Sequence, residues 1–277
     1  MTETRTDDQN ADIAAALDGD REALGRVVGA IQPMVYRLAL RFFGHPQDAE
    51  DAGQEALIQI VTRLDRFKGR SAFSTWVYRV ATNKFLSMAR TRNERHALSF
   101  EEFDRDLATV SMTSKLPTIE DVDERLLMEE AKIGCTLAML RCLDRGHRMA
   151  YVLGEIMELD HTTGAEILAI SPAAFRKRLQ RARTRITELM RARCGLFDSA
   201  NACRCHLRVP VAIELGRIDP HDLLYATSAE QARRFPQVLQ VIRRLDEAER
   251  AGALYRSHPE MRTQADFEQF FDGIFGS

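Results

Sequence analysis

Residues 160–193 carry the start signals of two consecutive helices, and this segment constrains the fold more than any other part of the chain. Asp160 can cap a short first helix, and Ser171-Pro172 supplies an N-cap and a first-position proline for a second helix. One stripe of the second helix is apolar and is formed by Phe175, Leu179, Ala182 and Ile186. The segment therefore predicts a helix-turn-helix.

The remaining faces of the second predicted helix are basic and polar. In a helix-turn-helix the start of this helix lies near base edges, and arginines along it reach phosphates. An ordinary basic surface helix is the alternative, but the cap, the proline, the stripe and the charge all agree with DNA binding. The residues predicted to face DNA are Ser171, Pro172, Ala173, Ala174, Arg176, Lys177, Gln180 and Arg181.

Helical spacing of apolar residues dominates the rest of the chain, and strand-like alternation is scarce. Aromatic residues make up only 7% of the sequence, which also suits a helical protein. We therefore predict an all-α fold with two helical modules, a flexible acidic linker and a mostly helical C-terminal extension. The first module spans residues 11–95, the linker 96–124, the second module 125–193 and the extension 194–277.

Helices are expected in the first module at residues 13–31, 34–42, 47–64 and 73–91, with Pro33 separating the first two. The linker shows no sustained period. In the extension, residues 194–210 are also poor in period, and helical patterns occur near 229–251 and 264–275.

Charge is distributed unevenly, although the formal net charge is only −2. Residues 63–95 hold nine Lys and Arg against two acids, and residues 171–193 hold eight against one. Between them, residues 94–124 carry nine acids and three basic residues. Solvated helix faces could explain either basic block alone, but two such blocks on separate modules favour a polyanionic partner.

The five cysteines do not form an even-numbered disulfide framework, and no apolar run is long enough to span a membrane. With a polar, acidic N-terminus, the expected location is the cytoplasm without membrane insertion. Cys135 and Cys142 are expected in the core. The group Cys194, Cys203, Cys205 and His206 leaves three alternatives open, namely structural zinc, a redox-sensing disulfide and simple packing. We predict no cofactor, with zinc as the alternative.

Signatures of catalysis are missing from the sequence. The seven histidines are scattered, and neither a G-x-S-x-G, a phosphate-binding P-loop nor an H-E-x-x-H motif occurs. We therefore expect a protein that acts by binding and is not an enzyme.

Three segments together resemble the extracytoplasmic-function (group IV) sigma factors of the sigma-70 family, here with a C-terminal extension. Ile167–Arg183 resembles region 4. Asp48-Ala-Glu-Asp-Ala-Gly-Gln-Glu-Ala-Leu resembles region 2.2. Phe67-Lys-Gly-Arg-Ser-Ala-Phe-Ser-Thr-Trp-Val-Tyr-Arg-Val-Ala-Thr-Asn-Lys-Phe resembles regions 2.3 and 2.4. The resemblance covers about Ala23–Arg95 and Arg125–Arg193.

The resemblance implies that this protein binds core RNA polymerase, at the clamp coiled coil of the largest subunit and at the flap. The contact would lie on the predicted helix at residues 47–64. Compensation of the helix dipole is the alternative explanation for Asp48 and Glu50, which lie near the start of that helix. In the family the acidic linker threads the channel later used by RNA, although a plain soluble tether would have the same composition. An anti-sigma factor is a further candidate partner. The predicted polymerase contacts are Asp48, Asp51, Gln54 and Glu55.

By the same resemblance, the fourth helix and the loop before it read the −10 promoter element and hold an unstacked base. A core role is the alternative for Trp76, the single tryptophan, and is expected for Phe73, Val77, Val80 and Phe85. The predicted −10 contacts are Lys68, Arg70, Ser74, Thr75, Trp76, Arg79, Asn83 and Lys84. The predicted helix-turn-helix contacts would read the −35 element.

The sequence thus predicts a transcription initiation factor that directs RNA polymerase to promoters and helps melt them. The alternative is a stand-alone helix-turn-helix regulator with a metal- or redox-sensing extension.

Two residues depart from the family pattern. Gly164 replaces a large apolar residue and is expected to leave core space unfilled, and Ala169 replaces the turn glycine, where a left-handed backbone is strained.

Overall fold

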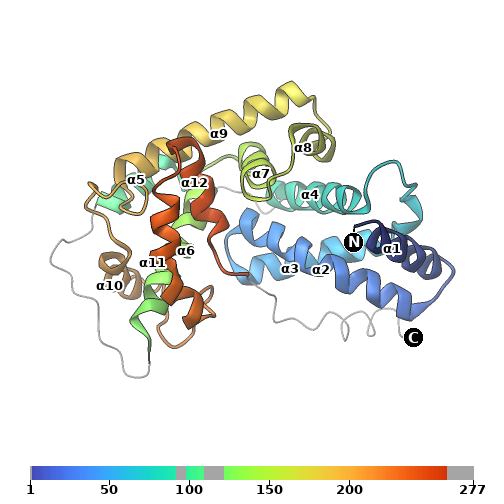
Figure 1. Cartoon of the computed structure of the whole chain (residues 1–277), viewed down its shortest axis with the longest axis horizontal. Coiled ribbons are helices and arrows are strands. Elements are labelled where there is room, and N and C mark those ends of the chain that lie inside the picture. Colours follow the sequence, from blue (N-terminus) through green and yellow to red (C-terminus); the bar gives the residue numbers. More distant parts are fainter. Residues whose placement is uncertain (1, 92–97, 109–121, 261–277) are drawn as a thin grey trace.

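The computed structural model of this chain describes residues 2–91, 98–108 and 122–260. Their regular structure is helical, apart from isolated β-bridges that join Cys194 to Cys203 and Asp219 to Asp222 (Figure 1). The predicted all-α class is confirmed. The elements are α1 (Thr2–Leu17), α2 (Arg21–Phe43), α3 (Pro46–Val61), η1 (Leu64–Arg66), α4 (Phe73–Thr91), α5 (Phe100–Ala108), α6 (Glu124–Arg141), α7 (Arg145–Tyr151), η2 (Val152–Ile156), α8 (His161–Leu168), α9 (Pro172–Arg193), α10 (Cys205–Glu214), α11 (Ala229–Ile242) and α12 (Glu247–Arg256).

In the first module, helix α2 begins later and runs further than the sequence predicted. The carboxylate of Asp20 accepts hydrogen bonds from the backbone N–H groups of Glu22 and Ala23, which fixes the start of α2. The predicted break at Pro33 is wrong, because Pro33 lies inside α2. Proline disturbs the carbonyl four residues earlier. That carbonyl belongs to Gly29, and both residues are exposed, so water can satisfy it.

Helices α2, α3 and α4 pack against one another through small and aliphatic side chains. One stripe of α3 is fully buried and consists of Ala49, Ala52, Ala56 and Ile60, each 0% exposed. From α4, Phe73, Val77 and Phe85 are buried as predicted, whereas Val80 is only partly buried. Small residues on α3 let the helices approach closely, so α4 packs directly against α3 and α2.

Part of the linker is not irregular, contrary to the prediction. Helix α5 buries Phe103 and Leu107 and packs against α9. Its acids face basic residues that lie far away in the sequence. Arg193 donates to Asp104 at 2.6 and 2.8 Å, and Arg208 donates to Asp106 at 2.6 Å. Charge pairing and two apolar anchors therefore order a segment whose composition alone indicates flexibility.

The second module forms the predicted helix-turn-helix from α8 and α9, supported by α7 and η2. The predicted stripe of α9 is fully buried, with exposures of 0–1% for Phe175, Leu179, Ala182 and Ile186. In Figure 1, α9 runs along the top of the molecule and presents its opposite side to solvent.

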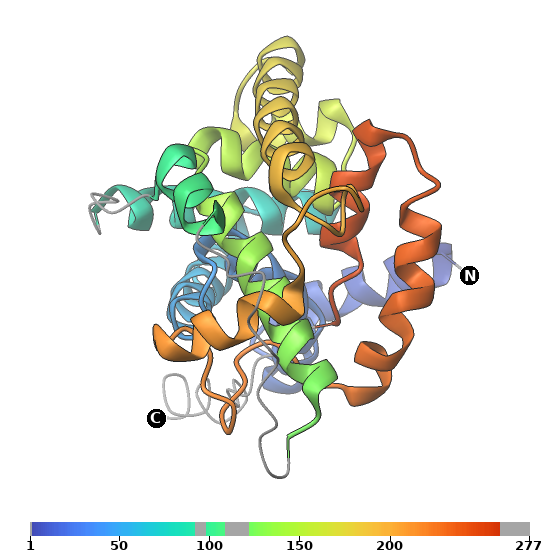
Figure 2. The same ribbon diagram turned by 90° about the vertical axis from the view of Figure 1, so that its left-hand side faces the viewer.

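The extension wraps around the second module (Figure 2). Helix α10 was missed by the sequence analysis, and it packs on α6 together with α11. Helix α12 packs on α9 and η2, and Gly252 permits this, because a Cβ at that position would lie 2.2 Å from Glu155 Oε1. The helical pattern predicted at residues 264–275 lies outside the described residues.

The two modules contact each other directly, which the sequence did not predict. Helix α4 of the first module packs against α8 and α7 of the second, and α2 packs against α6 (Figure 1). Among the described residues, no helix is both long enough and apolar enough to cross a membrane.

Candidate nucleic-acid interface

Helix α9 begins as the sequence predicted. Ser171 Oγ accepts a hydrogen bond from the Ala174 N–H at 3.2 Å, and Pro172 occupies the first helical position. The preceding turn places Ala169 in the left-handed region at φ 51° and ψ 45°. The tight turn therefore forms with alanine in place of glycine. The left-handed backbone of Ala169 is strained, and the packing of α8 on α9 holds it in this conformation.

The expectation that Gly164 leaves core space unfilled is wrong. The ring of Phe175 fills this space, and a Cβ on residue 164 would lie 2.3 Å from Phe175 Cζ. Glycine thus lets α8 lie directly on the aromatic ring of α9. This contact sets the position of α9 relative to α8.

The side chains predicted to read the −35 element lie on the solvent side of α9. Only Ala174 is partly buried, and its N–H is taken by the cap. The Arg176, Lys177 and Arg181 side chains form no ion pair with any residue that the structure describes. The exposed members are Ser171, Pro172, Ala173, Arg176, Lys177, Gln180 and Arg181.

The predicted −10 surface is built around three aromatic rings. The ring of Phe73 stacks on Trp76 with centroids 5.9 Å apart, and Phe67 lies 5.1 Å from Phe73 and 5.8 Å from Trp76. Trp76 is half-buried, so one part of the indole packs and another part remains accessible. A partly exposed aromatic cluster beside a basic loop can stack an unpaired base.

Not every predicted −10 residue is presented at this surface. Thr75 is 9% exposed and points into the core, so its predicted contact is not available in this arrangement. The exposed members are Lys68, Arg70, Ser74 and Asn83. The side chain of Lys68 donates to the backbone carbonyl of Asp65 at 2.7 Å, which holds the loop after η1.

Ion pairs engage the two remaining cations of the predicted −10 surface. Arg79 on α4 donates to Glu166 on α8 at 2.8 Å, which ties the first module to the helix-turn-helix. Lys84 lies 2.5 Å from Glu55 on α3. The sequence analysis missed Glu166, and no local signal could reveal it, because its partner is 87 residues away.

The acidic residues predicted to contact polymerase lie along one side of α3. Asp48, Asp51 and Gln54 are partly buried, and Glu55 is exposed. Gln47 donates to Asp51 at 3.4 Å. The acidic side of α3 therefore borders the basic side of α4 at the Glu55–Lys84 pair, so the two candidate surfaces are continuous.

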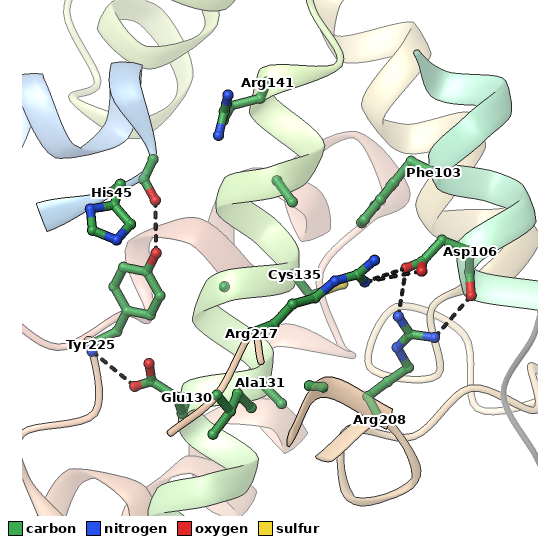
Figure 3. Close-up of a pocket in the computed structure, with 15 residues that line it drawn as sticks. His45, Phe103, Asp106, Glu130, Ala131, Cys135, Arg141, Arg208, Arg217 and Tyr225 are labelled. Atoms are coloured by element: carbon green, nitrogen blue, oxygen red, sulfur yellow. Dashed lines mark hydrogen bonds and ion pairs between the residues drawn. The ribbon is translucent and has the colours of Figure 1, made fainter. Parts of the chain in front are cut away.

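A cavity of about 230 Å³ lies where α5, α6, the α2–α3 turn and the extension meet (Figure 3). On one side Tyr225 donates its hydroxyl to the carbonyl of Gly44 at 2.8 Å. The carboxylate of Glu130 accepts hydrogen bonds from the N–H groups of residues 224–226, yet burial prevails and raises its pKa. Burial also acts to raise the pKa of Asp106, but its pairs with Arg217 and Arg208 outweigh this and lower it.

The cysteines of the extension gather near α6, but His206 does not join them. Cys194 and Cys203 are backbone neighbours in a β-bridge, whereas His206 is exposed. Burial raises the pKa of Cys194, Cys203 and Cys205, which keeps these thiols protonated. Within the described ranges, no three His, Cys, Asp or Glu side chains form a metal-binding group. Cys142 is buried and Cys135 packs against the core, as predicted.

Comparison with known proteins bears on both modules. The family described as sigma-70 region 2 matches residues 27–95. The chain is similar to the ECF RNA polymerase sigma factor SigW of Bacillus subtilis, with 30% identity over 62% of this chain and 91% of that protein. It is also similar to the RNA polymerase sigma factor NccH of Alcaligenes xylosoxydans xylosoxydans, with 31% identity over 69% of this chain and 98% of NccH.

Among solved structures, CnrH in complex with the cytosolic domain of CnrY matches with 24% identity and a TM-score of 0.45, over 66% of this chain and 97% of CnrH. NccH aligns over nearly its whole length with about two thirds of this chain, so the remaining third has no counterpart in that relative. Because the sequence relatives are matched almost end to end, and because the helix-turn-helix and the region 2 segment occur in the expected order, the chain belongs to the extracytoplasmic-function sigma factors of RNA polymerase.

Proposed function

We propose that this chain binds core RNA polymerase through α3 and directs the enzyme to promoters, with α9 on the −35 element and α4 with its preceding loop on the −10 element. It acts by binding and carries out no covalent chemistry. The division into modules at residues 95, 124 and 193 is part of this proposal. A cytoplasmic location and an anti-sigma partner remain predictions.

The observation that carries the proposal is the solvent-exposed basic and polar side of α9, which is the second helix of a helix-turn-helix with its turn and its N-cap in place. The aromatic cluster of Phe67, Phe73 and Trp76 supports the melting role. A stand-alone regulator needs neither this cluster nor the acidic side of α3, and the sigma-factor relatives also favour the initiation factor.

The direct test is transcription in vitro with purified core polymerase on genomic fragments. Specific transcripts should appear only when the chain is added, and their start sites would identify both promoter elements. Transcription that never exceeds the level of core polymerase alone would overturn the proposal. Tight duplex binding by the isolated chain in that case would favour the stand-alone regulator.

Removing three cations from α9 is expected to weaken promoter binding by the polymerase holoenzyme. The variant combines Arg176→Ala, Lys177→Ala and Arg181→Ala. It should lower the steepness of log affinity against log salt by up to about three, because DNA binding releases fewer counterions when fewer phosphates are contacted. Binding is measured by fluorescence anisotropy across a salt series.

The matched control changes three exposed arginines of the extension, Arg233, Arg234 and Arg244, to alanine, so the net charge is the same. This control should retain the slope of the unchanged protein. Equal slopes for both triple variants would mean that α9 is not the helix that contacts DNA.

Altering the acidic side of α3 is expected to weaken binding to core polymerase by about tenfold or more, because a positive charge then faces a basic partner. The variant combines Asp51→Lys with Glu55→Gln. Glutamine is preferred at position 55 because a lysine there would face Lys84, which lies 2.5 Å from Glu55. Affinity is measured by surface plasmon resonance on immobilised core enzyme.

The control is Glu214→Lys, which reverses an exposed acid on α10 away from the candidate surface. It should bind core polymerase as the unchanged protein does. Undiminished binding by the α3 variant, with its circular dichroism intact, would remove α3 from the proposed polymerase contact.

A further inference from the structure

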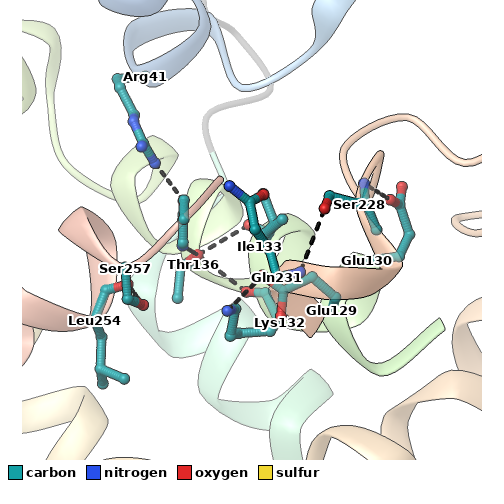
Figure 4. Close-up of polar contacts among 12 residues, drawn as sticks. Arg41, Glu129, Glu130, Lys132, Ile133, Thr136, Ser228, Gln231, Leu254 and Ser257 are labelled. Carbon is teal, nitrogen blue, oxygen red and sulfur yellow. Dashed lines mark hydrogen bonds and ion pairs between the residues drawn. The ribbon is translucent and has the colours of Figure 1, made fainter. Parts of the chain in front are cut away.

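His258 follows α12 and connects three parts of the molecule. An N–H of Arg41 on α2 bonds to the Nδ1 of His258, and the Nε2 of His258 lies 2.9 Å from Thr136 Oγ1 on α6. His258 is only 7% exposed. A single buried side chain of the extension thus bridges the first and second modules. Figure 4 shows Arg41 extending from α2 toward the part of α6 that holds Thr136 and Lys132.

The partners of His258 determine its protonation state. The Thr136 hydroxyl donates its proton to the carbonyls of Lys132 and Ile133, at 3.0 and 2.9 Å. Thr136 Oγ1 must therefore accept from Nε2–H, and Nδ1 must accept from the guanidinium of Arg41. Only the neutral Nε2–H tautomer satisfies both contacts. A proton on Nδ1 would place a donor against a donor and a cation against a cation.

The groups around His258 strengthen this preference. Arg41 approaches from α2, Lys132 from α6, and the Tyr255 ring from α12 at 5.9 Å, and the charge of Arg37 acts on Arg41. Lys132 is paired with Glu129 at 2.6 Å, and Arg37 with Glu260 at 3.1 Å. Burial lowers the pKa of His258 well below its usual value, and the charges of Arg41 and Lys132 lower it further.

Other contacts of the extension reach the same junction. Tyr255 donates its hydroxyl to the Thr136 carbonyl at 3.0 Å, and Tyr225 donates to the Gly44 carbonyl at 2.8 Å. We call the arrangement in which the two modules pack together the closed arrangement. In it α8 packs on α4, and Glu166 forms an ion pair with Arg79 of the candidate −10 surface. Under the proposed function α4 and α9 bind two separate promoter elements, so we expect the modules to move apart on DNA.

We propose that the extension is a latch on this closed arrangement, in which neutral His258 clasps α2 to α6, and that a proton on His258 releases the first module from the second. The consequence for promoter binding rests on the proposed function, whereas the opening itself does not.

The sign of the pH effect follows from linkage. In the open form His258 is exposed and titrates near its ordinary value of 6.5, whereas in the closed form it stays neutral to much lower pH. The latch therefore contributes fully above pH 6.5 and is lost as the pH falls below this value. Between about pH 7.5 and 5.5 the ratio of open to closed molecules should rise about tenfold.

Single-molecule energy transfer in the full chain measures this ratio without polymerase or DNA. Dyes are attached to non-natural amino acids at two exposed positions, Arg90 on α4 and Thr184 on α9. The unchanged protein should show the tenfold rise in its low-transfer population. The His258→Gln variant should remain closed and lose the response, because the amide can accept from Arg41 and donate to Thr136 but does not titrate.

His221→Gln serves as the matched control, since His221 is an exposed histidine of the same extension, and it should respond as the unchanged protein does. Thr136→Val, which removes the acceptor on α6, should raise the open population at pH 7.5. A pH response in His258→Gln equal to that of the unchanged protein would overturn the latch. So would a ratio that is independent of pH in every variant. Neither result would affect transcription with core polymerase, so the proposed function is judged separately.

Discussion

Replacing Phe175 with alanine is expected to lower the free energy of unfolding by about 3–5 kcal/mol, the usual cost of deleting a fully buried aromatic ring. Phe175 is 0% exposed and fills the space left open by Gly164. Without the ring, α8 and α9 lose the contact that sets their relative position. Urea unfolding followed by circular dichroism measures the loss.

A double-mutant cycle tests whether the glycine and the ring act as a pair. Gly164→Ala alone should cost about 1–3 kcal/mol, because its Cβ overlaps the ring. In the Phe175→Ala background the same change should cost clearly less, since the space is then free. Additive losses would show that the two residues do not depend on each other.

Replacing Arg148 with methionine is expected to cost about 3–5 kcal/mol, because buried carbonyl groups lose a charged donor. Arg148 is 3% exposed and donates to the carbonyls of Leu140 at 3.1 Å, Leu143 at 2.9 Å and Phe42 at 3.1 Å. One guanidinium thus satisfies the carboxyl ends of α6 and α2 together. Thermal and urea unfolding measure the loss.

Arg145→Met in the same helix is the matched control, because the Arg145 side chain forms no hydrogen bond or ion pair with the residues that the structure describes. It should change the free energy of unfolding by less than about 0.5 kcal/mol. A loss below about 1 kcal/mol for Arg148→Met would mean that water replaces the guanidinium at these carbonyls.

Local signals in the sequence predicted the helix-turn-helix. The cap at Ser171, the proline at position 172 and the apolar stripe of α9 all lie within one turn or a few turns of one another, and the structure has each of them in place. The helical class was equally accessible, because helical periodicity needs only nearby residues. Local propensity misled the analysis at Pro33, where exposure of the Gly29 carbonyl offsets the lost hydrogen bond.

Long-range partners account for the remaining differences. The linker forms α5 because Arg193 and Arg208, about a hundred residues later, pair with its acids. Thr75 is buried and Arg79 is paired with Glu166, although both read as exposed residues in the helix pattern. The assignments of individual side chains to polymerase and to the two promoter elements stay predictions.

The amino-acid sequence by itself determined the helical class, the helix-turn-helix and the family, since these depend on spacing, caps and motifs within short stretches of chain. Only the tertiary structure decided that the two modules pack together, that Phe175 replaces the missing side chain of Gly164, and that His258 is held neutral between α2 and α6. The physical reason is that burial, and the protonation state that burial imposes, are set by residues brought together from distant parts of the chain.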